Sequence, residues 1–186
     1  MENDDIILIE KSLEGDTSAF EILVSRYLKH IYNFVYHLSG NVDEANDISQ
    51  EVFVKVWKNL KKFDPEQNFK TWLFSIARNT TIDYFRKKKS ISFGDMEIGE
   101  STSFEDSLTD EEPLPDEIFE RKELGTFLEK ALETLPLEGR TIILLHDKED
   151  LTFEEISKIL KKPMNTVKSQ YRRAILAFRK TMNAPK

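Results

Sequence analysis

The chain has 186 residues, of which 39% are apolar and none is cysteine, and its formal net charge is −7. This length allows one ordinary domain or two small ones, and the absence of cysteine excludes a disulfide framework and thiolate chemistry. The acidic N-terminus lacks the features of a signal peptide, and no apolar run approaches the roughly 20 residues of a membrane span. We therefore expect a cytoplasmic protein without membrane insertion.

Charge is strongly segregated along the chain. Residues 55–89 carry a net charge of +7, and residues 158–186 contain nine basic residues and no acidic one. Residues 90–120, between these blocks, contain eleven acidic residues and no basic one. Basic blocks of this kind suggest a nucleic-acid partner, although the acidic blocks would repel DNA. The distribution of charge is therefore more informative than its total.

Four amphipathic helices are predicted before residue 90. Apolar residues recur at helical spacing over about residues 6–13, 18–39, 43–61 and 69–89. Asn41 or Asp43 can cap the third helix. Asn68 can cap the fourth, after the turn that Asp64 and Pro65 introduce. We expect these helices to form a compact domain over residues 1–89.

The third helix has an acidic face near its beginning. Asp47 and Glu51 are four residues apart and therefore share a face, to which Gln50 is adjacent. Acidic residues in the first turn, such as Glu44, are also favoured by the helix dipole. The spacing alone is consistent with a solvated surface and with a docking site for a basic partner helix.

The fourth helix, with the sequence FKTWLFSIARNTTIDYFRKKK over residues 69–89, combines aromatic residues with a basic end. Cations at Arg86 to Lys89 can bind phosphates, and exposed rings can stack on unpaired bases. The same features also suit a buried aromatic face and a basic end that interacts favourably with the helix dipole. Taken alone, this segment leaves both interpretations open.

Residues 90–115 are predicted to form a flexible acidic linker. They are rich in Ser, Gly, Asp and Glu, contain two prolines and show no helical period. Repulsion between the acidic residues is expected to extend such a segment. The linker is either a soluble tether or a mimic of nucleic acid that lies in a basic channel of a partner.

Residues 116–186 predict a second helical domain that contains a helix-turn-helix. Thr152 and Glu155 have the spacing of a capping box, and the helix that they begin ends before Pro163. A basic helix follows over about residues 165–181. A helix, a short turn and a basic helix form the plan of a domain that reads the major groove of DNA.

The sequence contains no clear pattern for catalysis or metal binding. The histidines, His30, His37 and His146, lack metal-ligand partners at useful spacing. There is no glycine-rich loop of the kind that holds phosphates, and the carboxylates are spread over helix surfaces and the linker. We therefore expect no enzyme activity, no cofactor, no metal and no small-molecule substrate.

Three motifs, in this order, resemble one protein family. Residues 43–57, DEANDISQEVFVKVW, resemble a polymerase-binding helix, and residues 69–87, FKTWLFSIARNTTIDYFRK, resemble the −10 recognition and melting segment W-L-x-x-I-A-R-N-x-x-x-D-x-x-R. Residues 135–140, LPLEGR, and residues 153–174 resemble a −35 reading domain. The family is the extracytoplasmic-function (ECF, group IV) type of bacterial RNA polymerase sigma factor, within the sigma-70 family.

The resemblance implies a sigma factor that binds core RNA polymerase, directs it to specific promoters and helps to open the −10 element. It assigns contacts with the clamp coiled coil of polymerase to Glu44, Asp47, Gln50 and Glu51. It assigns −10 DNA contacts to Phe69, Lys70, Trp72, Arg78, Asn79, Arg86, Lys87, Lys88 and Lys89. It assigns −35 DNA contacts to Asn165, Thr166, Lys168, Ser169, Gln170, Arg172 and Arg173.

Three positions near the basic helix depart from the family pattern. Gln170 replaces a cation, and because Gln pairs bidentately with adenine, the −35 preference is expected to shift. Lys161 stands where the turn often has Gly, so either a left-handed backbone there is somewhat strained or the turn differs. Asn165 replaces another Gly and can cap the basic helix.

Two other functions are compatible with a helix-turn-helix. A conventional DNA-binding transcriptional regulator would act without being a polymerase subunit and would bind a palindromic site. A helical adaptor that binds only proteins would have no salt-dependent affinity for DNA. Neither requires the pattern of residues 72–86.

The partners that the resemblance implies are core RNA polymerase, through its clamp coiled coil and its flap, and promoter DNA. Members of the family are often held by an anti-sigma factor, but no residue here identifies one.

Overall fold

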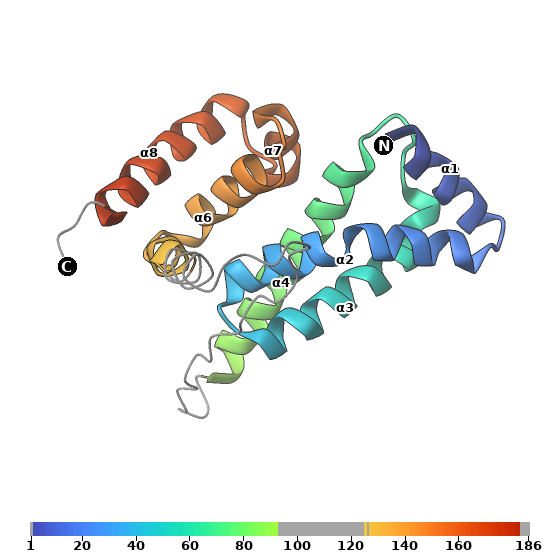
Figure 1. Cartoon of the computed structure of the whole chain (residues 1–186), viewed down its shortest axis with the longest axis horizontal. Helices are drawn as coiled ribbons and strands as arrows, with labels where there is room; N and C mark the ends of the chain where they lie inside the picture. The colour runs from blue at the N-terminus through green and yellow to red at the C-terminus, as the bar shows by residue number, and fades with distance from the viewer. Residues whose placement is uncertain (1, 93–124, 126, 183–186) are drawn as a thin grey trace, which may run out of the picture.

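The computed structural model describes residues 2–92, 125 and 127–182, and all regular structure in these residues is helical. The first group of helices comprises α1 (Glu2–Leu13), α2 (Thr17–Ser39), α3 (Val42–Asn59), the 3-10 turn η1 (Leu60–Lys62) and α4 (Phe69–Ser92). The second comprises α6 (Leu137–Ile143), the π turn η2 (Leu144–Lys148), α7 (Phe153–Leu160) and α8 (Met164–Met182) (Figure 1). Residues 127–133 are also helical. The predicted all-α fold with two helical domains is confirmed.

The predicted linker is only partly covered by the described residues. Its first residues, 90–92, continue α4 as helix. Residues 93–115, which carry the predicted flexible acidic segment, lie outside the described residues, as do residues 116–124 at the start of the predicted second domain. The proposed domain boundaries therefore stay predictions.

Local capping explains why α2 ends and α3 begins where they do. Gly40 has a left-handed backbone with φ of 69°, which glycine adopts without a Cβ clash, and its N–H donates to the carbonyl of Tyr36. The side chain of Asn41 then accepts a hydrogen bond from the N–H of Glu44. The two helices are thus joined by a short turn in which the exposed backbone groups have partners.

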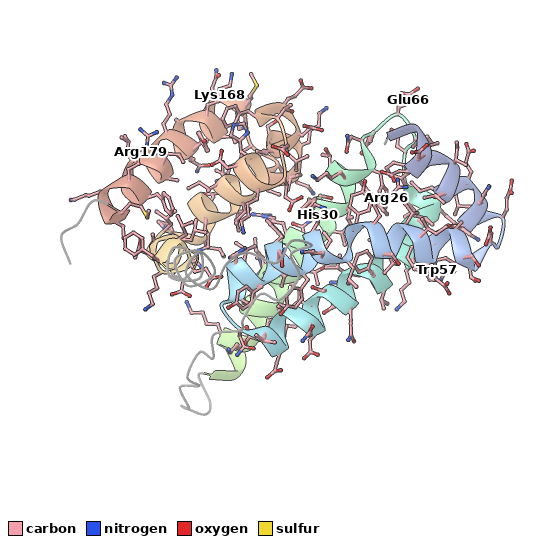
Figure 2. The ribbon with its side chains drawn as sticks, viewed as in Figure 1. Arg26, His30, Trp57, Glu66, Lys168 and Arg179 are labelled. Carbon is pink, nitrogen blue, oxygen red and sulfur yellow. The ribbon has the colours of Figure 1, made fainter. Side chains whose placement is uncertain are left out.

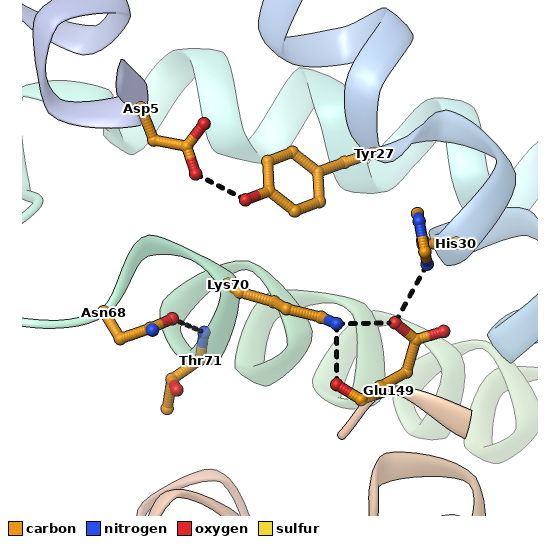
Figure 3. Close-up of polar contacts among 7 residues, drawn as sticks. All are labelled: Asp5, Tyr27, His30, Asn68, Lys70, Thr71 and Glu149. Atoms are coloured by element: carbon orange, nitrogen blue, oxygen red, sulfur yellow. Dashed lines mark hydrogen bonds and ion pairs between the residues drawn. The ribbon is translucent and has the colours of Figure 1, made fainter. Parts of the chain in front are cut away.

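The core of the first domain lies between α2, α3 and α4. Ile31, Ile48 and Leu73 are completely buried there, and the rings of Phe34 and Phe74 meet edge to face at 5.2 Å between centroids. Helix α1 joins this core through the buried side chain of Ile9. The buried carboxylate of Asp5 also accepts hydrogen bonds from Arg26 and Tyr27 of α2, and Figure 3 shows the contact with Tyr27.

The second domain contains the predicted helix-turn-helix. The side chain of Thr152 accepts from the N–H of Glu155, and the carboxylate of Glu155 accepts from the N–H of Thr152, which confirms the capping box of α7. Lys161 adopts a left-handed backbone with φ of 53°, so the turn keeps its conformation without glycine. The predicted cap at Asn165 is wrong, because α8 begins at Met164 and Asn165 lies within its first turn.

The two domains contact each other through α7 and α4 and through α6 and α2. The buried carboxylate of Glu149 lies 3.1 Å from the ammonium of Lys70 and 3.0 Å from the imidazole of His30 (Figure 3). Lys70 also donates to the carbonyl of Glu149, and the hydroxyl of Thr71 donates to the carboxylate of Glu155. The contact therefore joins the first turn of α4 to Glu149, before the loop that leads to α7, and to Glu155 in the first turn of α7.

A second set of contacts attaches α6 to the end of α2. The guanidinium of Arg140 donates to the carbonyls of His37, at 3.3 Å, and Glu133, at 2.7 Å. Burial lowers the pKa of Arg140 from its ordinary value. Arg140 thus supplies donors to the carbonyl end of α2, where backbone acceptors lack partners in their own helix.

Candidate nucleic-acid interface

Helix α4 divides the predicted −10 residues between the core and the surface. Phe69 is only 4% exposed, and its ring meets those of Tyr27 and Phe63, each at 5.5 Å between centroids. Phe69 is therefore a core residue, which corrects its assignment as a base contact. Trp72 is partly exposed, and Asn79 is exposed. The helical period sends these two side chains to a face that the core does not cover.

A hollow between α3 and α4 brings Trp72 and Asn79 together with residues that the sequence did not single out. Its volume is about 270 Å³, and it is lined by Lys55, Asn59, Lys62, Trp72, Ile76, Asn79, Thr80 and Asp83. An indole ring, two amides and two ammonium groups thus converge at one place, together with the carboxylate of Asp83. One of the two ammonium groups, that of Lys55, is paired with Glu51. This set of groups can stack on a base, hydrogen-bond its edge and bind its phosphate.

The cations of α4 differ in their availability. Lys70 is engaged by Glu149 across the domain contact, and Lys88 donates to the carboxylate of Glu44. The hydrogen bond with Glu44 raises the pKa of Lys88. Arg78 is partly buried and donates to the side chain of Asn79 at 3.1 Å. At the end of α4, Arg86, Lys87, Lys88 and Lys89 are all exposed, although Lys88 is paired with Glu44 and Arg86 lies 3.6 Å from Asp83.

The predicted polymerase-binding face on α3 exposes fewer acidic side chains and more apolar surface than expected. Glu44 is only 9% exposed and is paired with Lys88, so it is a poor candidate for a surface contact. Asp47 and Gln50 are exposed, whereas Glu51 is partly exposed and pairs with Lys55 at 2.8 Å.

Two apolar residues extend the exposed face of α3. Val54 is 49% exposed, and Trp57, which projects from α3 in Figure 2, is 45% exposed. Val54 is four residues after Gln50 and Trp57 seven, so all three lie on one side of the helix. The exposed fraction of Val54 and Trp57 could not be read from the sequence, because the same period also fits the core.

On α8, the predicted −35 residues have different surroundings. Asn165, Ser169, Arg172 and Arg173 are exposed, and Thr166 is partly exposed. Lys168 lies over the ring of Phe153 at 5.9 Å, and Gln170 donates to the carboxylate of Glu138 at 3.0 Å. Figure 2 shows Lys168 and Arg179 on the outer side of α8, away from the first domain. The exposed cations of α8 thus line an outer surface of the molecule.

An aromatic cluster holds the inner side of α8 in place. The ring of Tyr171 meets those of His146 and Phe153 at 5.0 and 5.2 Å, and its hydroxyl donates to Asp147 at 2.8 Å. Burial and the carboxylate of Asp147 raise the pKa of Tyr171 to about 12. The tyrosine therefore remains a protonated donor at neutral pH and links α8 to the π turn η2.

Comparison with known proteins identifies the family. Residues 23–91 match the model of Sigma-70 region 2, and residues 128–178 match that of Sigma-70 region 4. The chain is 36% identical over 176 residues to the ECF RNA polymerase sigma factor SigW of Bacillus subtilis, with 94% of each chain covered. The chain belongs to the ECF RNA polymerase sigma factors. It is also 33% identical over 174 residues to the ECF sigma-E factor of Escherichia coli, which covers 91% of this sigma factor and 90% of that protein.

Solved structures share the fold of this sigma factor. CnrH, in complex with the cytosolic domain of CnrY, aligns with a TM-score of 0.72 at 22% identity and covers 98% of this chain and 99% of its own. The sigma factor RpoE of Bartonella quintana, in complex with the anti-sigma factor NepR, aligns with a TM-score of 0.72 at 24% identity, covering 90% and 98% of the two chains. Both alignments span the two helical domains.

The sigma factor carries its candidate contact surfaces on separate elements. The hollow and the exposed face of α3 lie within the region 2 match, and α8 lies largely within the region 4 match. In the described residues, no group of three or more His, Cys, Asp or Glu side chains could hold a metal ion. No helix of the same part of the chain is long and apolar enough to cross a membrane.

Proposed function

We propose that this sigma factor binds core RNA polymerase, directs it to promoters with a −10 and a −35 element, and helps to open the −10 element. The observation that carries the proposal is the hollow between α3 and α4, where Trp72, Asn79, Lys55 and Lys62 converge. Family membership supports the role in transcription, and the hollow supports a contact with an unpaired base. The chain acts through binding energy rather than through an enzymatic reaction, and it acts in the cytoplasm.

The hollow receives a base of the −10 element after that base has left the duplex. Opening costs on the order of 1.4 kcal/mol of stacking per base step. Stacking on a protein ring returns ~1–3 kcal/mol per base, and amide groups add discrimination between bases. A few such contacts, together with contacts made by polymerase, are sufficient to hold a short bubble without ATP. The exposed cations Arg86, Lys87 and Lys89 bind the adjacent duplex backbone.

Helix α8 reads the −35 element. Its exposed cations Arg172 and Arg173 bind phosphates or guanines, and Ser169 and Thr166 reach base edges or backbone from the first half of the helix. The position of α8 on the outer side of the second domain supports this role, because a recognition helix must enter the major groove without obstruction from its own domain (Figure 1).

The exposed face of α3 binds the clamp coiled coil of polymerase. Asp47 and Gln50 supply polar contacts, and Val54 and Trp57 supply the apolar centre that stable protein interfaces require. The second domain binds the flap. We also propose an anti-sigma factor as a partner, because both similar solved structures are complexes with a second protein and one of these is described as an anti-sigma factor.

Run-off transcription tests the proposed function. Purified core polymerase is incubated with a library of promoter fragments, with and without the sigma factor. We expect a set of transcripts with defined start sites that appears only when the sigma factor is present. If no promoter-specific transcript depends on it, the proposed function is rejected.

A further inference from the structure

Glu138, in the first turn of α6, contacts two parts of the helix-turn-helix at once. One carboxylate oxygen accepts a hydrogen bond from the ammonium of Lys162, in the turn before α8. The other accepts from the amide nitrogen of Gln170, in α8 itself, at 3.0 Å. A single carboxylate outside the helix-turn-helix therefore holds two polar side chains beside the reading surface, by which we mean the exposed residues of α8 that are proposed to contact the −35 element.

Close packing fixes the position of this carboxylate. A Cβ atom added at Gly139 would lie 3.1 Å from the Cβ of Ala174, which is tighter than ordinary van der Waals contact. Because residue 139 is glycine and has no Cβ, α6 can approach α8 closely at this point. Since Glu138 directly precedes this contact, its carboxylate is held beside α8 rather than carried on a mobile segment.

Gln170 is withdrawn from the reading surface by this arrangement. Its amide nitrogen donates to Glu138, and its amide oxygen is buried with no hydrogen-bond partner in the described part of the chain. A glutamine that reads adenine uses both its oxygen and its nitrogen on the base edge. In this conformation neither atom is available for that pairing.

We propose that Glu138 is a specificity-determining positioning residue of the −35 domain. It keeps Gln170 away from the bases, so that Gln170 makes no contribution to base preference, and it neutralises Lys162 beside the DNA backbone. The −35 preference then depends on the other exposed residues of α8. This inference rests on the proposed function, because it concerns how the −35 element is read.

The test measures −35 base preference with full-length sigma factor and core polymerase, on a promoter library randomised in the −35 element. In Glu138→Ala, Gln170 is released and can pair with adenine. We expect a new preference for adenine at one position, of about fivefold or more, the lower end of what a bidentate pair provides. Glu154→Ala is the matched control, because Glu154 is an exposed acid of the same domain that pairs with Lys158 at 3.2 Å. It should leave the preference unchanged.

Substitution of Gln170 identifies the side chain responsible. Gln170→Ala alone should leave the wild-type base preference unchanged. The double variant, Glu138→Ala with Gln170→Ala, should lose the adenine preference of the single Glu138 variant and return to the wild-type pattern. A merely structural role of Glu138 would not produce a preference that a second truncation removes.

Glu138→Gln separates the two contacts. Its amide oxygen can still accept from Gln170, but the negative charge that neutralises Lys162 is lost. We expect the wild-type base preference together with a steeper salt dependence of promoter binding, by about one phosphate contact, a change of ~0.9 in the log–log slope. Thermal unfolding followed by circular dichroism checks that each variant is folded.

Two results would overturn the inference. One is a change of base preference in Gln170→Ala alone, which would mean that Gln170 already reads the DNA. The other is folded Glu138→Ala protein with the wild-type preference at every position. Wild-type protein without any promoter-dependent transcription would instead reject the proposed function, so the two failures are distinguishable.

Discussion

At the scale of single residues, Glu155 has two tasks. Its carboxylate caps α7 by accepting from the N–H and hydroxyl of Thr152, and it also accepts from the hydroxyl of Thr71 in α4 at 3.1 Å. Burial alone would raise the pKa of Glu155, but the hydrogen bonds from Thr152 and Thr71 outweigh it, and the pKa lies below its ordinary value of 4.5. The ionised carboxylate is thus favoured by the folded state.

This shift gives a prediction for the pH dependence of stability. Because the folded pKa of Glu155 is below the unfolded one, its contribution to stability is fully present above about pH 4.5 and is lost as pH falls through the folded pKa. Glu155→Gln should lower the free energy of unfolding by about 1 kcal/mol at pH 7. The difference from wild type should shrink below pH 4.5. Urea titrations at pH 7 and pH 3.5 check this, and an equal difference at both pH values would contradict it.

Asn79 gives a prediction for the hollow. Its exposed amide lines the hollow with Trp72 but packs little against the core, so Asn79→Ala should fold normally. We expect holoenzyme with this variant to bind a single-stranded −10 oligonucleotide about fivefold or more weakly, by fluorescence anisotropy. An oligonucleotide of unrelated sequence is the control, and its affinity should not change. An equal loss on both oligonucleotides would mean that Asn79 does not read the base.

Residue-scale errors of the sequence interpretation have one physical origin. Helical spacing assigned Phe69 and Glu44 to the correct helices, but it could not show that Tyr27 and Phe63 enclose Phe69 or that Lys88 pairs with Glu44. These neighbours come from other helices or other turns. The assignment of Gln170 likewise missed Glu138, which is 32 residues away in the sequence.

At the scale of elements, local signals predicted several helix ends correctly, although the predicted cap at Asn165 was wrong. The capping box of α7 and the bounds of α2 follow from residues within four positions of the helix ends, and both were predicted. The π turn η2 and the extension of α4 to Ser92 were not. The π turn is stabilised partly through Tyr171 of α8, a contact that no local pattern encodes.

Helix α3 gives a prediction at this scale. Val54→Asp places a charge on its exposed apolar surface, and because burying an unpaired charge in an interface is costly, we expect core polymerase to bind at least tenfold more weakly. Ile22→Asp is the matched control, since Ile22 is an equally exposed apolar residue of α2, at 50% against 49%. Surface plasmon resonance with immobilised core polymerase measures both. Equal losses would contradict a docking surface at Val54.

At the scale of the whole molecule, the contact between the domains conflicts with simultaneous binding of both promoter elements. The −35 and −10 elements are named for positions about 25 base pairs apart, which is about 85 Å of duplex. Thr71 of α4 is hydrogen-bonded to Glu155 of α7, and α7 packs on α8. With helix rises of 1.5 Å per residue and interaxial distances of about 10 Å, Asn79 and the far end of α8 are within roughly 60 Å. The domains must therefore separate.

Separation can be measured by fluorescence energy transfer. Because the chain has no cysteine, two introduced cysteines are the only sites that thiol-reactive fluorophores label. Fluorophores at Ser25→Cys and Glu154→Cys, in exposed positions of α2 and α7, should show high transfer efficiency in the isolated protein and low efficiency in the complex with polymerase and promoter. Adding Glu149→Ala, which removes the carboxylate shared by Lys70 and His30, should lower the efficiency of the isolated protein. A pair within the first domain, Ser25→Cys and Asp43→Cys, is the control. Unchanged efficiency on promoter binding would contradict the separation.

The central claim is that two domains of this sigma factor read two separate DNA elements. The most direct measurement is the sequence of the promoters that support transcription, selected from a random library with core polymerase. We predict two conserved blocks at constant spacing, with the upstream block lost in the Arg172→Ala, Arg173→Ala variant and the downstream block relaxed in Asn79→Ala. A single palindromic block, bound equally well without polymerase, would contradict the account.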